Sequence, residues 1–150
     1  MEDFWRLYKA IRAPSTLTKG SNYHLFKHGI TPEWEDIQNE EGGKWLFAFS
    51  RTDTRVDAAW IETLLAVIGE QLTDENEQEE ICGIVIAPRK GDTKLALWTR
   101  HAADDTVTKN IGTTWRKILN LKEIEKLQYQ EHDEALQRQT SFRNPPKYIV

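Results

Sequence analysis

The sequence of 150 residues has a single cysteine, Cys82, and no long run of apolar residues. One cysteine excludes an internal disulfide and a cysteine-based zinc site. No stretch approaches the roughly 18 apolar residues that cross a bilayer, and Met1 leads directly into an acidic helical pattern instead of a signal peptide. We therefore expect a soluble protein that does not contact membranes, located in the cytoplasm or also in the nucleus, with one domain over residues 1–150.

Positive charge is also scarce, with 20 Lys and Arg against 24 Asp and Glu and a formal net charge of −4. Binding to nucleic acid regardless of its sequence relies on many contacts of Lys and Arg with phosphates. Any nucleic-acid partner of this chain must therefore be bound by a local group of basic residues. The four histidines, His24, His28, His101 and His132, are scattered and match no metal or catalytic-triad motif. We predict no metal site, no cofactor and no enzymatic activity.

Apolar periodicity predicts the first of three helices in "EDFWRLYKAIR", residues 2–12. Phe4, Leu7, Tyr8 and Ile11 recur at the spacing of one helix face, which predicts that this face is buried. Trp5 lies off that apolar stripe, so its aromatic side chain is available for another contact.

The second predicted helix is "DAAWIETLLAVIGE", with Asp57 as its N-cap and Gly69 as its terminator. Its apolar arc is broad, and Ile61 and Leu65 lie at one edge of it. These two residues either complete the core or serve a second contact. The third helix is predicted in "DDTVTKNIGTTWRKILNL", although Gly112 weakens it.

Short apolar segments bounded by turn residues predict the strands. They are "NYHLFKHGI", "KWLFAFS" with Trp45, Phe47 and Phe49 alternating, "ICGIVIAP" with Cys82 as a buried thiol, "LALWT", "EKLQYQEH", and an edge strand over Lys147–Val150. The third and fourth form a hairpin with a basic turn, "RKGDTK". Strands joined in hairpin order and interrupted by three helices indicate an α+β fold, with an antiparallel sheet and helices on one face.

The loop "TPEWEDIQNEEGGKW" holds Trp34 beside Glu35 in surroundings too charged for a core. An indole can stack on a planar base, and a neighbouring carboxylate can accept the N1 and N2 protons of guanine. If that base is positively charged, the ring and the acid both favour it. The alternative is that Trp34 covers a core edge and Glu35 is solvated. The basic turn either binds phosphates or is a solvated hairpin tip.

The blocks "EDFWRLYKAI", "YHLFKHGITPEWED", "GGKWLFAFS", "WIETLLAVIGE", "ICGIVIAPRKGDTKLALWT" and "IGTTWRKILNL" closely resemble the eukaryotic translation initiation factor 4E family. The resemblance implies a curved antiparallel sheet with three helices packed on its convex face. It also implies a slot on the concave face that binds the 7-methylguanosine cap of messenger RNA. By resemblance, Trp34 stacks on the methylated guanine, Glu35 accepts its N1 and N2 protons, and Trp98 touches the methyl group.

The same resemblance implies contacts for the cap phosphates. It assigns them to Arg89 and Lys94, with Lys90 as a substitute because the turn "PRKGDTK" departs from the family's R-x-K-G-D-K. Arg138 in the polar tail is expected to reach the phosphates, and Ser141 is placed near the family's regulatory phosphoserine. Trp45, Trp60 and Trp115 resemble the family's structural tryptophans, and we predict that all three lie in the core.

A second surface is implied on the back of the sheet, for a Tyr-x4-Leu-hydrophobic helix of a factor 4G-type scaffold or of a 4E-binding repressor. It maps to Trp5, Ile61, Glu62, Leu65 and Gly69. Family members carry a further segment before "EDFW", with a first strand and the second sandwich tryptophan. Without that stacking face, cap binding should weaken by roughly 1–3 kcal/mol. Two hypotheses therefore stay open: an N-terminally shortened cap-binding factor, or a cap-deficient core that acts only as a protein-interaction module, as a repressor or competitor.

Overall fold

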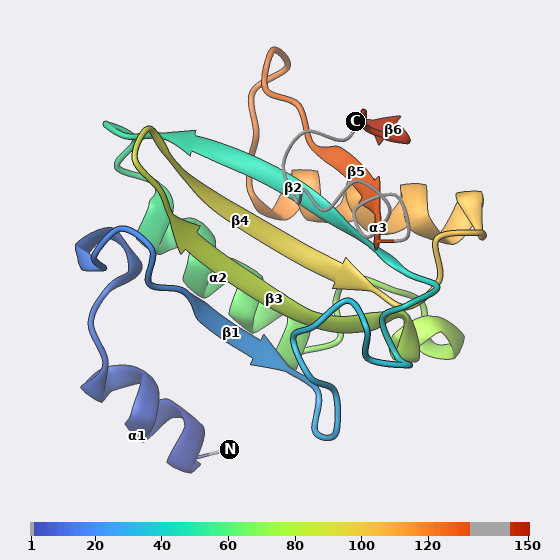
Figure 1. Ribbon diagram of the computed structural model, residues 1–150, viewed down its shortest axis with the longest axis horizontal. Coiled ribbons are helices and arrows are strands. Elements are labelled where there is room, and N and C mark those ends of the chain that lie inside the picture. Colours follow the sequence, from blue (N-terminus) through green and yellow to red (C-terminus); the bar gives the residue numbers. More distant parts are fainter. Residues whose placement is uncertain (1, 133–144) are drawn as a thin grey trace.

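The structure is a computed structural model that describes residues 2–132 and 145–150 (Figure 1). At its centre is a six-stranded antiparallel sheet with the strand order β1-β3-β4-β2-β5-β6. The strands are β1 (Tyr23–Phe26), β2 (Gly43–Ser50), β3 (Ile81–Pro88), β4 (Asp92–Thr99), β5 (Gln128–Glu131) and β6 (Tyr148–Ile149). The helices are α1 (Glu2–Ala10), α2 (Val56–Ile68) and α3 (Asp105–Ile118), with short 3-10 helices η1 (Pro14–Thr16) and η2 (Glu75–Glu80).

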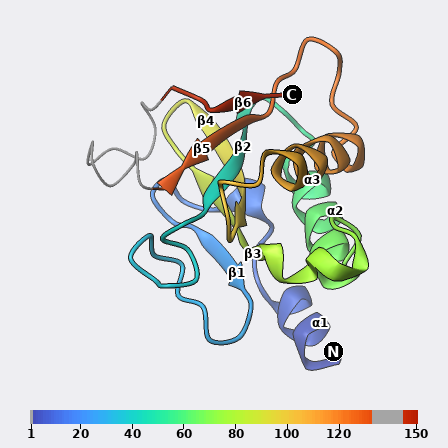
Figure 2. The same cartoon turned by 90° about the vertical axis from the view of Figure 1, so that its right-hand side faces the viewer.

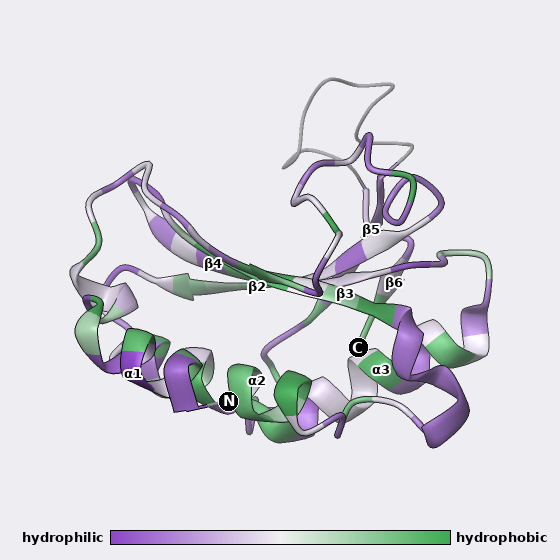
Figure 3. Ribbon diagram, turned by 90° about the horizontal axis from the view of Figure 1, so that it is seen from below, coloured by the Kyte–Doolittle hydropathy of each residue, from purple (hydrophilic) through white to green (hydrophobic). Residues whose placement is uncertain are grey.

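The three α-helices all lie on the convex face of the curved sheet, as Figures 2 and 3 show from two directions. The predicted α+β architecture is confirmed. No α-helix of the described ranges covers the concave face. Side chains of the sheet that point to that face are therefore not covered by an α-helix of these ranges.

The order of the strands differs from the predicted succession of hairpins, which was wrong. Only β3 with β4 and β5 with β6 are neighbours both along the chain and in the sheet. β2 lies between β4 and β5, which follow it in the sequence. Strands that lie far apart in the sequence are not joined by a short turn, so no turn residues in the sequence indicate that they pair. Their register is set instead by which face of each strand is buried.

The core fills the space between the sheet and the helices, and it contains three of the six tryptophans. Trp45, Trp60 and Trp115 are buried, which confirms the prediction that they are core residues. The indole N–H of Trp45 donates to the carbonyl of Thr108, and that of Trp115 donates to the hydroxyl of Thr63, both at 3.0 Å. Burying an indole stabilises the fold most when its N–H keeps an acceptor, as it does in these two cases.

Gly112 allows α3 to approach the sheet closely. A Cβ atom at this position would lie only 2.3 Å from Cζ2 of Trp45. The glycine that weakens the helix pattern in the sequence is therefore required by packing, because any side chain there collides with the buried indole.

The start of α2 differs from the prediction. The helix begins at Val56 after Arg55, so Asp57 lies in the first turn and is not the N-cap. The Asp57 carboxylate instead accepts hydrogen bonds from the backbone N–H of Ser15 at 2.8 Å and from its hydroxyl at 2.6 Å. Asp57 thus ties η1 to α2. The predicted end of the helix at Gly69 is correct.

The predicted apolar stripe of α1 is only partly buried. Phe4 and Tyr8 pack against the core, whereas Leu7 is 62% exposed and Ile11 lies beyond the last residue of the helix. Trp5 is half-buried, between the rings of Phe4 and Tyr8. The helix therefore contacts the core along a narrower strip than its periodicity suggests.

Candidate functional site: a pocket on the concave face

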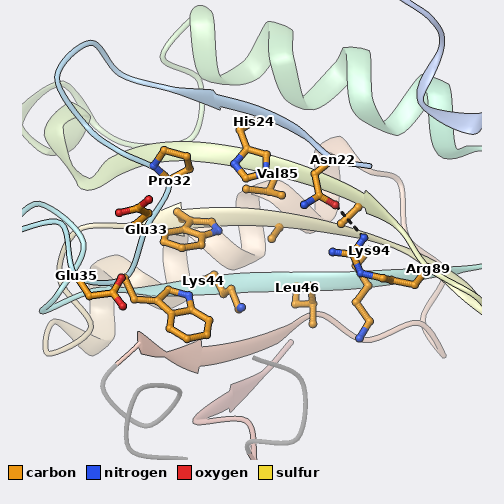
Figure 4. Close-up of a pocket in the computed structure, with 14 residues that line it drawn as sticks. Asn22, His24, Pro32, Glu33, Glu35, Lys44, Leu46, Val85, Arg89 and Lys94 are labelled. Atoms are coloured by element: carbon orange, nitrogen blue, oxygen red, sulfur yellow. Dashed lines mark hydrogen bonds between the residues drawn. The ribbon is translucent and has the colours of Figure 1, made fainter. Parts of the chain in front are cut away.

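A pocket of about 700 Å³ opens on the concave face of the sheet (Figure 4). Its volume falls within the range of small-molecule binding sites. We call it the concave pocket; it is lined by Asn22, His24, Pro32, Glu33, Trp34, Glu35, Lys44, Leu46, Val85, Ala87, Arg89, Lys94, Ala96 and Trp98. Five of the residues singled out in the sequence are among them. The lining comes from strands β1 to β4, from the loop between β1 and β2, from the β3–β4 turn at Arg89, and from Asn22 just before β1.

The loop between β1 and β2 brings Trp34 and Glu35 to the rim of the pocket. Asp36 holds the loop in shape, because its carboxylate accepts hydrogen bonds from the backbone N–H and hydroxyl of Thr31 and from the backbone N–H of Gln38. These hydrogen bonds, led by that of the Thr31 hydroxyl, hold the pKa of Asp36 below its ordinary value. The loop is therefore braced directly beside the two candidate ligand-binding residues.

Asn39 braces the same loop from inside. Its buried side-chain amide donates to the carbonyls of Thr31 and Glu33, both at 2.8 Å. Neither Asp36 nor Asn39 was predicted from the sequence to shape this loop. Asp36 carried a usable signal, since an Asp whose side chain caps the backbone two residues later is a recurrent turn motif.

Trp98 on β4 is a buried ring with a small open part, at 5% exposure. Its centroid lies 5.4 Å from that of Phe26, edge to face, and 4.2 Å from that of His132. It belongs to a small apolar cluster with Cys82, whose burial raises the pKa of the thiol to about 11. The prediction of a buried strand thiol at Cys82 is confirmed. The ring of Trp98 is held in place by these contacts, and it also lines the concave pocket.

Lys44 on β2 places an amine inside the pocket. The residue is 4% exposed, and its Nζ atom lies 5.9 Å from the ring centroids of both Trp34 and Trp98. Burial, assisted by the charge of Lys94, lowers the pKa of Lys44 to about 8. A lysine that loses its proton this close to neutral pH is a titratable group within the site.

Arg89 and Lys94 line the opposite end of the pocket from Glu35, as the labelled side chains in Figure 4 show. The guanidinium of Arg89 donates to the side-chain oxygen of Asn22 at 2.8 Å. Burial lowers the pKa of Lys94. Lys90 is exposed and does not line the pocket, so the basic turn presents two cations to this space.

The predicted back surface lies on the helical side of the molecule. Trp5 is half-buried on α1, and Ile61 is half-buried on α2. Glu62 and Gly69 are exposed, and Leu65 is 49% exposed although it is apolar. Ile61 and Leu65 are one turn apart on α2, so the structure leaves an apolar strip open on this helix.

Other expectations concern absent features or undescribed residues. Arg138 and Ser141 lie outside the described residues. Within residues 2–132 and 145–150, no helix is long and apolar enough to cross a membrane. The same ranges contain no group of three His, Cys, Asp or Glu side chains placed to hold a metal ion.

Comparison with known proteins identifies the family of this chain. The family described as Eukaryotic initiation factor 4E matches residues 1–147. The chain belongs to this initiation factor 4E family. It is 44% identical over 141 residues to eukaryotic translation initiation factor isoform 4E-2 of Oryza sativa subsp. japonica, which covers 94% of the chain and 66% of that relative. The chain spans about two thirds of the length of the curated relatives it matches.

Solved structures of initiation factor 4E proteins share the fold. The chain superposes on eIF4E-3 of C. elegans, in a complex with the 4E-binding protein Mextli and a cap analog, with a TM-score of 0.89 and 36% identity. It superposes on eIF4E-3 of Ascaris suum, in a complex with the m7G cap, with a TM-score of 0.89 and 39% identity. All of this chain is covered in both cases, with 80% of the first structure and 79% of the second.

In this initiation factor 4E family member, the pocket includes residues that the sequence analysis did not single out for it. His24 and Asn22 come from β1 and the residue before it, and Lys44 comes from β2. The alternation of Trp45, Phe47 and Phe49 carried a usable signal for Lys44. Residues between buried ones on a strand point to the opposite face, which here is the concave one.

Proposed function

We propose that this chain binds the 7-methylguanosine cap of messenger RNA in the concave pocket, and a partner's helix on its convex side, and so recruits mRNA for translation initiation. It does this by binding alone, without catalysing a reaction, and acts in the cytoplasm. The observation that carries the proposal is the pocket itself, which has an indole and a carboxylate at one end and two cations at the other. The two eIF4E-3 proteins solved with a cap analog or the m7G cap support it.

The base would lie at the end that holds Trp34 and Glu35. Methylation gives 7-methylguanine a positive charge, which strengthens its attraction to the face of an indole. The Glu35 carboxylate would accept the N1 and N2 protons, because the two oxygens of a carboxylate suit paired donors. Trp98 would contact the methyl group through the part of its ring that stays open.

The phosphates would extend toward Arg89 and Lys94. A guanidinium binds phosphate oxygens through two parallel N–H donors, and a lysine binds them as a point charge. Lys90 lies outside the pocket lining, so its role as a substitute stays a prediction. The contribution of Arg138 stays a prediction.

The partner would be a helix of a factor 4G-type scaffold or a 4E-binding repressor, carrying the Tyr-x4-Leu-hydrophobic motif. Leu65 and Ile61 offer it an apolar strip on α2, with Glu62 beside them, and Trp5 on α1 and Gly69 complete the proposed surface. An amphipathic helix binds such a strip through residues spaced by one turn. The C. elegans eIF4E-3 solved with the 4E-binding protein Mextli supports this assignment.

A second candidate function is a protein-interaction module with little cap affinity. It is favoured by the aromatic lining of the described pocket, which consists of the half-buried Trp34, the nearly buried Trp98 and His24. A base there would have one indole, that of the half-buried Trp34, to stack on. Under this hypothesis the partner helix still binds to α2 and the cap does not bind.

The experiment that separates the two functions is a titration of tryptophan fluorescence with 7-methylguanosine triphosphate, with GTP as the control. Cap binding predicts quenching by the methylated nucleotide at concentrations where GTP has little effect. Glu35→Gln should abolish this preference, while Glu33→Gln, a neighbouring acid on the same pocket, should retain it. An unchanged response in Glu35→Gln would contradict the proposed role of this carboxylate, and binding of a partner peptide alone would favour the second function.

A further inference from the structure

The proposed partner surface is built from two helices, α1 and α2. Trp5 lies on α1, and Ile61 and Leu65 lie on α2, so the relative position of the helices decides whether one partner helix can contact both. Figures 2 and 3 show α1 beside α2 in the helical layer. α1 is held lightly there, because none of its residues is fully buried and its contacts with the core are made by Phe4 and Tyr8.

The segment that follows α1 is fastened to α2 at Ser15. The Asp57 carboxylate, in the first turn of α2, accepts hydrogen bonds from the backbone N–H of Ser15 at 2.8 Å and from the Ser15 hydroxyl at 2.6 Å. The same carboxylate acts on α1, because burial and then the charge of Asp57 raise the pKa of Tyr8. Asp57 therefore faces both η1 and α1, and its contact with Ser15 helps to set the position of α1 relative to α2.

The packing between these elements leaves room for α1 to move. A pocket of about 220 Å³ is lined by Tyr8 and Lys9 of α1, by Arg12 and Pro14 after it, and by Trp60 of α2. Close packing would hold α1 rigidly against α2, whereas a space large enough for several water molecules does not. α1 can therefore shift when the contact between η1 and α2 opens.

Ser15 is placed to receive a charge that opens this contact. The residue is exposed, and Arg12 precedes it by three positions, which is the kind of charge pattern by which kinases choose substrates. A phosphate on its Oγ atom would replace a hydrogen-bond donor by a group with a charge of about −1.5 to −2 beside the Asp57 carboxylate. The two negative groups repel each other, and the cations of Lys9 and Arg12 attract the phosphate away from α2.

We propose that Ser15 is a phosphorylation site and that its contact with Asp57 is a switch for the partner surface. A protein kinase transfers the γ-phosphoryl group of ATP. The bond from Ser15 Oγ to phosphorus forms, the bond from that phosphorus to the bridging oxygen of ADP breaks, and the hydroxyl proton passes to a base of the kinase. The phosphate separates Ser15 from Asp57, α1 shifts relative to α2, and the partner helix binds more weakly. This inference rests on the proposed function of the convex side, and it leaves the concave pocket unchanged.

The first test compares Ser15→Glu, which supplies part of the charge of a phosphate, with the wild type. A labelled peptide with the Tyr-x4-Leu-hydrophobic motif should bind to Ser15→Glu roughly tenfold more weakly, while the affinity for 7-methylguanosine triphosphate stays the same. Ser15→Ala keeps the backbone hydrogen bond to Asp57 and adds no charge, so it should weaken peptide binding less. Wild-type peptide affinity in Ser15→Glu would overturn the inference and leave the proposed function intact. A wild type that binds no peptide would overturn the proposed partner surface, and the role of Ser15 in it.

The matched control is Thr18→Glu, which adds the same charge to the same segment. The Thr18 hydroxyl shares a hydrogen bond with that of Ser21 at 3.2 Å, so this variant should keep the wild-type peptide affinity. The double variant Ser15→Glu with Asp57→Asn should regain most of that affinity, because an amide at position 57 can donate to the new carboxylate and still accept the backbone N–H. General damage to the fold would not be repaired in this way. Without recovery in the double variant, repulsion by Asp57 is not the cause and the switch is overturned.

A second measurement needs no partner. Hydrogen exchange of the backbone amides of α1 should be faster in Ser15→Glu than in Thr18→Glu and the wild type, because α1 is no longer held against α2. The amides of α3 should exchange at the same rate in all three proteins. Equal exchange in α1 would overturn the switch, whatever the peptide does.

The modification itself is tested with ATP and a kinase that requires an arginine three residues before its serine. Mass spectrometry should find a phosphate on Ser15 of the wild-type protein and little on Arg12→Gln. A wild-type protein that stays unmodified, under conditions in which a free peptide of the same sequence is modified, would overturn the assignment of Ser15 as a phosphorylation site.

Discussion

Trp45 and Trp34 show how the same residue type is used on the two sides of this sheet. Trp45 points to the convex side, is fully buried, donates its N–H to Thr108 and presses against the backbone of α3 at Gly112. Trp34 is half-buried on a braced loop, with the amine of Lys44 near its ring. Trp45 is packed on every side, whereas Trp34 has one side that a ligand can contact.

The difference teaches that a tryptophan with charged neighbours is the one that remains available to a ligand. Trp45 is surrounded by apolar side chains, and its one polar group, the indole N–H, donates to an acceptor within the fold. Around Trp34 lie Glu33, Glu35 and Lys44, whose charges fit a charged ligand better than an apolar core. If this comparison holds, changes on the convex side should affect folding, and changes on the concave side should affect binding.

The largest effect is expected from Trp45→Ala. It removes a fully buried indole and leaves a cavity, which should lower the free energy of unfolding by about 3–5 kcal/mol. Trp34→Ala should lower it by no more than about 1 kcal/mol. Urea unfolding followed by circular dichroism measures both. Similar losses in the two variants would break the comparison.

Gly112→Ala should destabilise the protein even though alanine favours helix. The added methyl group collides with Trp45, and overpacking of a buried contact typically costs about 1–3 kcal/mol. Gly91→Ala is the matched control, because an added Cβ there meets nothing within 4 Å, and its effect should stay within about 0.5 kcal/mol. A stabilised Gly112→Ala variant would show that α3 moves away from the sheet at no cost.

Trp34→Ala should weaken binding of 7-methylguanosine triphosphate about ten- to a hundredfold, because it removes the stacking surface. Trp5→Ala, on the other side of the molecule, should leave that affinity unchanged and weaken binding of a partner helix. Fluorescence polarisation of labelled cap analogue and of labelled peptide gives the two affinities. Loss of both affinities in either variant would argue that the two surfaces are not independent.

The smallest effect is expected from Asp36→Asn, which weakens the hydrogen bonds that brace the loop beside Trp34. The pKa of Asp36 is lowered by these bonds, so its carboxylate stabilises the folded protein above its ordinary pKa. That contribution is lost as the pH falls through the lowered pKa. The stability difference between wild type and Asp36→Asn should therefore shrink as the pH is taken from about 5 toward 3. A difference that does not change with pH would mean that the charge of Asp36 is unimportant.

The sequence predicted those parts of the fold that depend on local periodicity. The three helices, the β3–β4 hairpin and the buried Trp45, Trp60 and Trp115 follow from spacing, composition and resemblance. The position of β2 between β4 and β5 could not be predicted this way, because the partners of Trp45 are Leu97 and Tyr129, far along the chain. Asp57 was misplaced for a similar reason, since its hydrogen bonds go to Ser15 in another segment.

The concave pocket was predicted in outline through family resemblance, which supplied Trp34, Glu35, Trp98, Arg89 and Lys94. The roles of these residues in binding remain proposals. Lys44 was missed because a lysine between two glycines and a tryptophan suggests a solvated turn, whereas the structure starts β2 at Gly43 and buries the amine. A charged side chain can be assigned to a site only when the residues that line the site on both sides of it are known.

The contact between Gly112 and Trp45 also links two positions that are far apart in the sequence. The missing side chain at 112 is what lets the indole at 45 fit between α3 and the sheet. A smaller residue at 45 would make room for a side chain at 112, and a larger residue at 112 would demand a smaller one at 45. Among related chains, these two positions should therefore change together, as a covarying pair that reports the separation between helix and sheet.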